Sequence, residues 1–107
     1  MTSGLEAALA GASSASWSQR VRAGCDLAPF ADVPEAADVL VRLLLDVEDS
    51  AVTRRTAEAL ARVGTVAAAR LIALAGVEAD DNQADWIQTG VRDALAGTDG
   101  GPDAAAD

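Results

Sequence analysis

Residues 52–64 read VTRRTAEALARVG, and this stretch decides which fold we expect for the chain. Its apolar and small side chains recur at the spacing of one helical face, at Val52, Thr56, Ala59, Leu60 and Val63. Asp49 or Ser50 can cap the start of such a helix, and Gly64 can end it, because glycine tolerates the left-handed conformation. The stretch therefore predicts an amphipathic helix with one buried face.

The rest of the chain divides into similar segments at clusters of Gly, Pro, Ser, Asp and Asn. No segment alternates strictly between apolar and polar residues, so no strand is expected. The spacing predicts an all-α chain with helices over residues 3–10, 16–28, 34–45, 51–63, 65–75 and 82–96. Residues 98–107 hold no apolar side chain larger than Ala or Pro, which predicts a disordered acidic tail after a single domain spanning 1–97.

The same helical spacing predicts the buried faces of the other segments. The expected face residues are Trp17, Val21, Gly24, Ala28, Val39, Leu40, Leu43, Leu44, Ala68, Leu71, Ile72, Ala75, Ile87, Val91, Ala94 and Leu95. Cys25, the single cysteine, is expected to be a small buried apolar residue. Trp17 and Trp86 stand near the starts of their segments, where they either pack in the core, seal the ends of a stack or anchor a partner.

The composition excludes many kinds of chemistry. The chain has 26 Ala among 107 residues, which favours closely packed helices, and it has no His, Lys or Tyr. Catalytic triads with His, His-ligated metals, P-loop lysines and Schiff-base lysines are therefore excluded, and one cysteine cannot form an intrachain disulfide. We expect a protein that is not an enzyme and that has no cofactor and no metal.

The charge balance predicts the type of partner. Seventeen acidic residues against 8 arginines give a net charge of −9, which opposes nucleic-acid binding and favours a protein partner with a basic surface. Acidity that serves solubility alone is the plain alternative. No secretory signal and no apolar run long enough for a membrane span are visible, and a lone cysteine fits a reducing cytoplasm.

The segments repeat along the chain. Leu27, Leu60 and Leu95 are spaced by 33 and 35 residues and lie near the ends of the second, fourth and sixth segments. Leu9, Leu40 and Leu71 are each 31 residues apart and lie in the first, third and fifth segments. A period of this length, built from two helices, predicts an array of three helical hairpins.

The repeat resembles a known family. Residues 52–64 are similar to the second helix of the short bacterial HEAT-like repeat found in phycobilin lyases, which reads roughly Val-Arg-x-x-Ala-x-x-Ala-Leu-x-x-Leu-Gly after an acidic turn. The matching positions are Val52, Arg54, Ala57, Ala59, Leu60 and Gly64, and residues 46–49 supply the acidic turn. The resemblance is good over residues 33–76, partial over 16–31 and weak over 1–12 and 82–95, the expected end caps. It implies an α-solenoid fragment whose second helices line the inner face.

Two sets of residues are candidates for binding. If the second helices line a concave face, a basic stripe that suits a carboxylate-rich peptide or a phosphate forms there, from Arg20, Arg22, Arg54, Arg55 and Arg92. Trp86 is a further candidate for contact with a partner. The alternative is that these arginines pair with nearby acidic residues and with the neighbouring turns. The second set, which we name the acidic ridge, consists of Asp46, Glu48, Asp49, Glu78, Asp80, Asp81 and Asp85, because corresponding turns of a stack lie side by side. The ridge suits a basic partner, and plain solvated turns are its alternative; it has no EF-hand spacing for calcium.

These observations favour a non-catalytic protein-binding adaptor or scaffold, in one form an inhibitor or immunity-type protein that neutralises a basic enzyme. The resemblance keeps open a second class, an accessory or lyase-like enzyme that acts on bilins. A third class is a nucleic-acid binder, against which the net charge of −9 counts strongly. A fourth is a structural module that self-associates, with a homodimer formed through a terminal helix.

Overall fold

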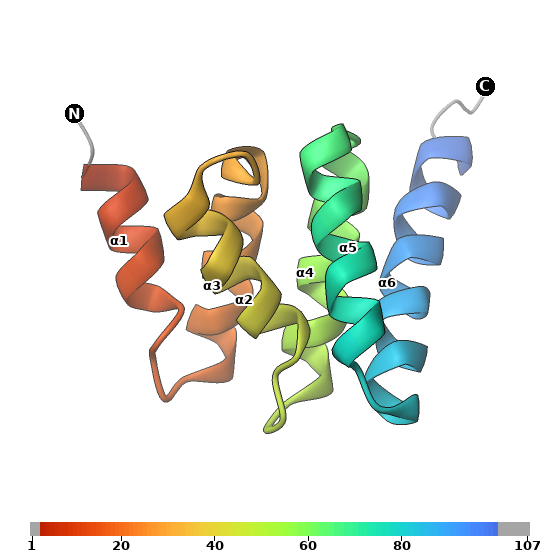
Figure 1. Cartoon of the computed structure of the whole chain (residues 1–107), viewed down its shortest axis with the longest axis horizontal. Coiled ribbons are helices and arrows are strands. Elements are labelled where there is room, and N and C mark those ends of the chain that lie inside the picture. The colour runs from red at the N-terminus through yellow and green to blue at the C-terminus, as the bar shows by residue number, and fades with distance from the viewer. Residues whose placement is uncertain (1–2, 101–107) are drawn as a thin grey trace.

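The computed structural model describes the backbone of residues 3–100 and the side chains of residues 5–96. Within that range the chain is all-α, without strands, as the periodicity predicted (Figure 1). The helices are α1 (Ser3–Gly11), α2 (Trp17–Leu27), α3 (Pro34–Leu44), α4 (Ser50–Val63), α5 (Val66–Glu78) and α6 (Asp81–Gly100), with a short 3₁₀-helix, η1 (Ala28–Phe30), after α2. None of these helices is long and apolar enough to cross a membrane.

The helices form two rows. The even-numbered helices pack in chain order, α2 against α4 and α4 against α6, while α1 lies against α2 and α3 lies against α5. Figure 1 shows α1 at one end and α6 at the other, with α3 and α5 in front of α2 and α4. The α1–α2, α3–α4 and α5–α6 loops all lie along the lower edge in that view, and this loop edge carries the acidic ridge.

Local capping sets the helix starts. The Ser16 hydroxyl accepts a hydrogen bond from the Gln19 N–H at 3.5 Å, and the Thr65 hydroxyl accepts from the Ala68 N–H at 3.1 Å. Between the two candidate caps of α4, Asp49 holds the position, since its carboxylate accepts from the Ala51 N–H at 2.9 Å. Each cap satisfies a backbone donor that the first helical turn leaves without a partner.

The observed helix ends agree less well with those expected from the sequence. Gly64 ends α4 in the left-handed conformation with φ of 70°, as expected. By contrast, α5 continues through Gly76 to Glu78, and α6 begins at Asp81 and continues through Gly97 to Gly100. The first three positions of the expected tail, 98–100, are therefore helical, and the remainder of that tail lies outside the described residues.

Leucines and alanines fill the space between the two rows. Leu27, Leu40, Leu44 and Leu60 are completely buried. Small residues bring the even-numbered helices close together: Gly24 of α2 faces Thr56 of α4, and a Cβ placed on Gly90 of α6 would lie 2.9 Å from the Cβ of Ala57 and overlap the backbone of α4. The high alanine and glycine content is thus used for close helix packing.

Three expected interior side chains lie at the surface instead. Trp17 is 52% exposed and Leu95 is 60% exposed, near the two ends of the even-numbered row. Cys25 is exposed as well, in contrast to its expected burial. Helical spacing identifies one face of a helix, but it does not tell which part of that face a neighbouring helix covers.

Candidate functional site: the loop edge

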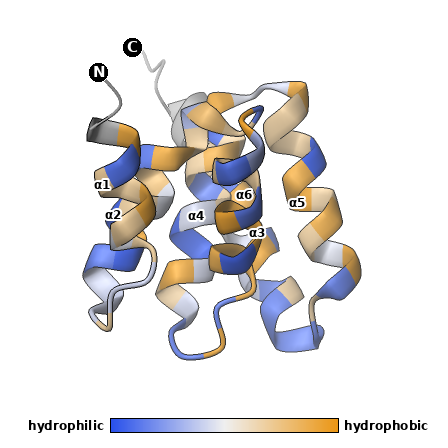
Figure 2. Cartoon of the chain, turned by 60° about the vertical axis from the view of Figure 1, so that its left-hand side comes forward, coloured by the Kyte–Doolittle hydropathy of each residue, from blue (hydrophilic) through white to orange (hydrophobic). Residues whose placement is uncertain are grey.

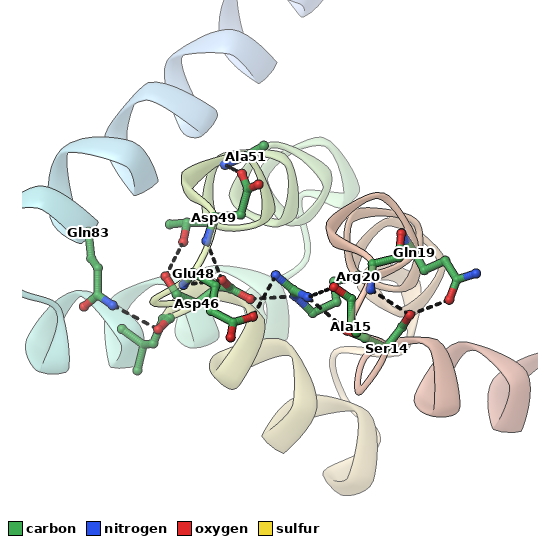
Figure 3. A network of polar contacts seen from close by, with 12 residues as sticks. Ser14, Ala15, Gln19, Arg20, Asp46, Glu48, Asp49, Ala51 and Gln83 are labelled. Atoms are coloured by element: carbon green, nitrogen blue, oxygen red, sulfur yellow. Dashed lines mark hydrogen bonds and ion pairs between the residues drawn. The ribbon is translucent and has the colours of Figure 1, made fainter.

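A buried arginine organises the loop edge. The Arg20 side chain is 8% exposed, and its Nε donates to Oδ2 of Asp46 at 2.9 Å. One terminal nitrogen of Arg20 donates to the carbonyl oxygens of Ser14 (2.9 Å) and Ala15 (3.1 Å), and the other lies 3.4 Å from the Glu48 carboxylate. Arg20 therefore joins the α1–α2 loop to the α3–α4 loop, and Figure 3 shows it between the two.

Asp46 holds the α3–α4 loop in shape from the other side. Its Oδ1 accepts hydrogen bonds from the backbone N–H groups of Glu48 (2.9 Å) and Asp49 (2.8 Å), while its carbonyl oxygen accepts from the Thr53 hydroxyl at 3.5 Å. Charge-assisted bonds of this kind fix the position of a carboxylate more firmly than neutral bonds do. The loop is consequently held in one conformation by its own acidic residue.

The α5–α6 loop is joined to the same assembly. The Gln83 side-chain amide donates to the carbonyl oxygen of Leu45 at 2.9 Å (Figure 3). Gln83 also closes a capping box, because its N–H donates to the Asp80 carboxylate at 2.7 Å while its side-chain oxygen accepts from the Asp80 N–H at 3.2 Å. The two acidic turns therefore lie side by side in the folded chain.

A pocket of about 310 Å³ opens between these two turns. The half-buried Trp86 forms part of its wall. The acidic ridge residues that line it are Asp46, Glu48, Asp49 and Asp80. A second pocket, of about 350 Å³, lies on the other side of the α3–α4 loop and is lined by residues that include Arg20, Arg42 and Glu48. The α3–α4 loop thus stands between two hollows on the loop edge.

The structure divides the acidic ridge into two groups. Asp46, Asp49 and Asp80 hold backbone N–H groups in place. The Glu48 side chain is 74% exposed and keeps one long contact to Arg20. The remaining carboxylates are exposed and have no side-chain hydrogen bond or ion pair within residues 5–96: Glu78, Asp81 and Asp85. The second group supplies negative charge that the fold itself does not use.

The arginines of the predicted basic stripe also fall into two groups, those that are buried or ion-paired and those that are exposed. Arg20 is buried in the loop edge and pairs with Asp46 of the neighbouring turn, which agrees with the alternative of pairing rather than with an arginine that faces a partner. Arg54 pairs with Asp93 of α6 at 2.8 Å, and Arg55 lies 3.8 Å from Glu58. The two stripe arginines that are exposed and form no ion pair with the described residues are Arg22 and Arg92.

Cys25 lies in a separate hollow between α2 and α4, beside Arg55 and Glu58. Although the residue as a whole is exposed, partial desolvation of the thiol in this hollow raises its pKa above the ordinary value, and the nearby Arg55 guanidinium lowers the pKa only in part. A raised pKa leaves little thiolate at neutral pH, which does not suit a nucleophile. No group of Cys, Asp or Glu side chains within the described residues is arranged to hold a metal ion.

Several residues of the loop edge could not be identified by type alone. Sequence reasoning missed Gln83, although the Asp80–Gln83 spacing is that of a capping box and was visible in the sequence. It also missed Thr53 and Asn82 in the wall of the pocket.

No protein-family model, no curated protein and no solved structure matches the chain significantly. The HEAT-like resemblance therefore stays a prediction.

Proposed function

We propose that this chain is a non-catalytic protein-binding module, a small HEAT-like adaptor or inhibitor, which binds a basic protein on its loop edge. The observation that carries the proposal is the pocket between the two acidic turns, with Trp86 in its wall and exposed carboxylates around it. A tryptophan beside carboxylates suits an arginine or lysine side chain, which gains from the ring face and from the negative charge together.

The distribution of charge supports the same assignment. Glu48, Glu78, Asp81 and Asp85 remain exposed along the loop edge, while Arg20, which contacts Glu48, is buried and neutralised by Asp46. On a chain of net charge −9, this edge attracts a basic surface at long range and speeds the encounter. As part of the same proposal we place the protein in a bacterial cytoplasm, in line with its single cysteine and the type of repeat it resembles.

The test compares two variants with equal changes of charge. The ridge variant combines Glu48→Gln, Glu78→Gln, Asp81→Asn and Asp85→Asn, which spare the carboxylates that cap backbone N–H groups. The control variant makes two Glu→Gln and two Asp→Asn changes at exposed residues away from the loop edge, namely Glu6, Glu35, Asp32 and Asp38.

Each immobilised protein is exposed to lysate of its own source at about 150 mM salt, where charges further apart than about 8 Å are screened. We expect one dominant basic protein to be retained by the wild type and by the control, and to be lost from the ridge variant. Equal retention by both variants, or no retained basic protein, overturns the proposal.

A second experiment uses tryptophan fluorescence. Trp17→Phe leaves Trp86 as the only tryptophan of the chain, since the sequence contains two. When the retained protein binds, the fluorescence emission of Trp86 and the accessibility of Trp86 to iodide should change. The retained protein is measured alone as a blank. An unchanged Trp86 signal on saturation would place the partner elsewhere on the molecule.

A further inference from the structure

The outward face of α5 is apolar and has no neighbour within the described residues. Val66 is 77% exposed and Val77 is 86% exposed, while the opposite face of α5 is buried in the core. At 100° per residue, Val66, Ala73 and Val77 lie along one line on the side away from that core. Figure 2 shows α5 at the right-hand side of the molecule, with apolar residues along much of its length.

The charges on this face are few and of opposite sign. Residues 66–77 contain no acidic residue, although the chain carries a net charge of −9. Arg70 lies in the middle of the face, while Glu78 lies at the C-terminal end of α5, about 120° round the helix from Val66, and both are exposed. Neither has an ion-pair partner among residues 5–96. A second copy of this acidic chain can therefore approach α5 without opposing carboxylates.

We propose that two copies of the chain dimerise through α5, with the two helices antiparallel about a two-fold axis that crosses the face. A two-fold interface uses the same patch on both copies, so the patch must be complementary to itself. In this arrangement Val66 of one copy opposes Val77 of the other, and toward the centre Ala69 is level with Leu74 and Arg70 with Ala73. The apolar ends of the face thus cover each other.

The two-fold axis also pairs the charges. Arg70 and Glu78 lie toward the same side of α5, and the axis places that side of one copy next to the same side of the other. Along the helix axis, Arg70 then lies about 7.5 Å from Glu78 of the second copy, at 1.5 Å per residue. Packed helix axes lie about 8–10 Å apart, so both long side chains must extend to form the ion pair. The dimer gains two equivalent ion pairs from residues that have none in the single chain.

The opposite side of the face is made of small residues, which permit close approach of two helices. Ala69, Ala73 and Gly76 lie there, and a Cβ built on Gly76 would meet nothing within 4 Å. Two other glycines inside helices, Gly24 and Gly90, are each packed against a neighbouring helix. No such neighbour within the described chain occupies the space beside Gly76.

The test is sedimentation velocity of the full chain, between about 1 µM and about 1 mM, the range in which a moderate dimer dissociates. We expect a monomer–dimer equilibrium. Arg70→Glu and Glu78→Arg each replace two attractive pairs by two repulsive ones, and each should raise the dissociation constant about tenfold or more. The double variant, which restores opposite charges, should return to within about threefold of the wild type.

The matched control is Arg22→Glu, which makes the same change of charge at an exposed arginine of α2 that forms no ion pair with the described residues. Far-UV circular dichroism verifies that all four variants remain helical. A wild type that stays monomeric throughout overturns the proposal. A dimer that the single α5 variants leave intact also overturns it, as does a double variant that stays as weak as the single ones.

Discussion

Replacing Gly90 by alanine tests the close packing of α6 on α4. A Cβ at Gly90 would lie 2.9 Å from the Cβ of Ala57 and 3.0 Å from the backbone nitrogen of Glu58, and it would overlap the carbonyl oxygen of Arg54. Two of these three atoms belong to the α4 backbone, which cannot turn aside as a flexible side chain can. The two helices must therefore move apart along their contact.

The magnitude follows from two opposing effects. Overpacking of a close contact costs about 1–3 kcal/mol, and we take the upper end because backbone atoms are involved. Alanine in a helix interior gains about 1 kcal/mol over glycine through the entropy of the unfolded chain. The net expectation is a loss of about 2 kcal/mol, which lowers the melting temperature by roughly 8–16 °C in a domain of this size.

The matched control is Gly76→Ala, the same chemical change inside α5. A Cβ at Gly76 would meet nothing within 4 Å, so only the gain in helix propensity remains, about 0.5–1 kcal/mol of added stability. Both variants are measured by urea and thermal unfolding at the same low protein concentration. If Gly90→Ala is as stable as the wild type, or if both variants shift in the same direction, the reasoning about the α4–α6 contact is refuted.

Three further predictions concern buried or partly buried polar groups. The Thr56 hydroxyl is buried and has no hydrogen-bond partner among the described residues, so Thr56→Val should add about 1 kcal/mol of stability in urea unfolding. Thr53→Val, which removes a bonded hydroxyl, should not add stability. Arg20→Met removes the ion-pair partner of Asp46 and the donor to two loop carbonyls, and should cost about 3 kcal/mol, against less than about 0.5 kcal/mol for the exposed Arg22→Met. Partial desolvation raises the pKa of the Cys25 thiol, so its alkylation by iodoacetamide should reach half its maximal rate at a higher pH than a cysteine peptide does, and an equal or lower midpoint would contradict this desolvation.

Much of the fold was predictable because the deciding signals are local. Ser16, Asp49 and Thr65 are polar residues directly before apolar helical spacing, and each caps a helix as that position predicts. Gly76 was expected to end a helix, yet α5 continues past it. A glycine inside a helix costs only about 1 kcal/mol, which the burial of a neighbouring residue such as Ala75 helps to offset.

The candidate site was predictable only in part, because its main contacts join distant parts of the chain. The repeat placed the two acidic turns at one edge, and the Gln83–Leu45 hydrogen bond joins them there. The pairing of Arg20 with Asp46 spans 26 residues, and nothing in the local sequence distinguishes Arg20 from the other arginines. Which acidic residue caps a helix and which stays exposed depends on backbone geometry that only the folded chain provides.

The division of the acidic ridge into carboxylates that hold backbone N–H groups and carboxylates that stay exposed determines how the ridge can be tested. If all seven carboxylates were capping groups, their removal would unfold the loops, and loss of binding would say nothing about a partner. Because Asp46, Asp49 and Asp80 hold the backbone, the exposed carboxylates Glu48 and Asp81 can be neutralised while the turns keep their shape. A loss of binding with unchanged unfolding free energy then reports on charge alone. An equal loss in the control variant would instead assign the effect to the net charge of the chain.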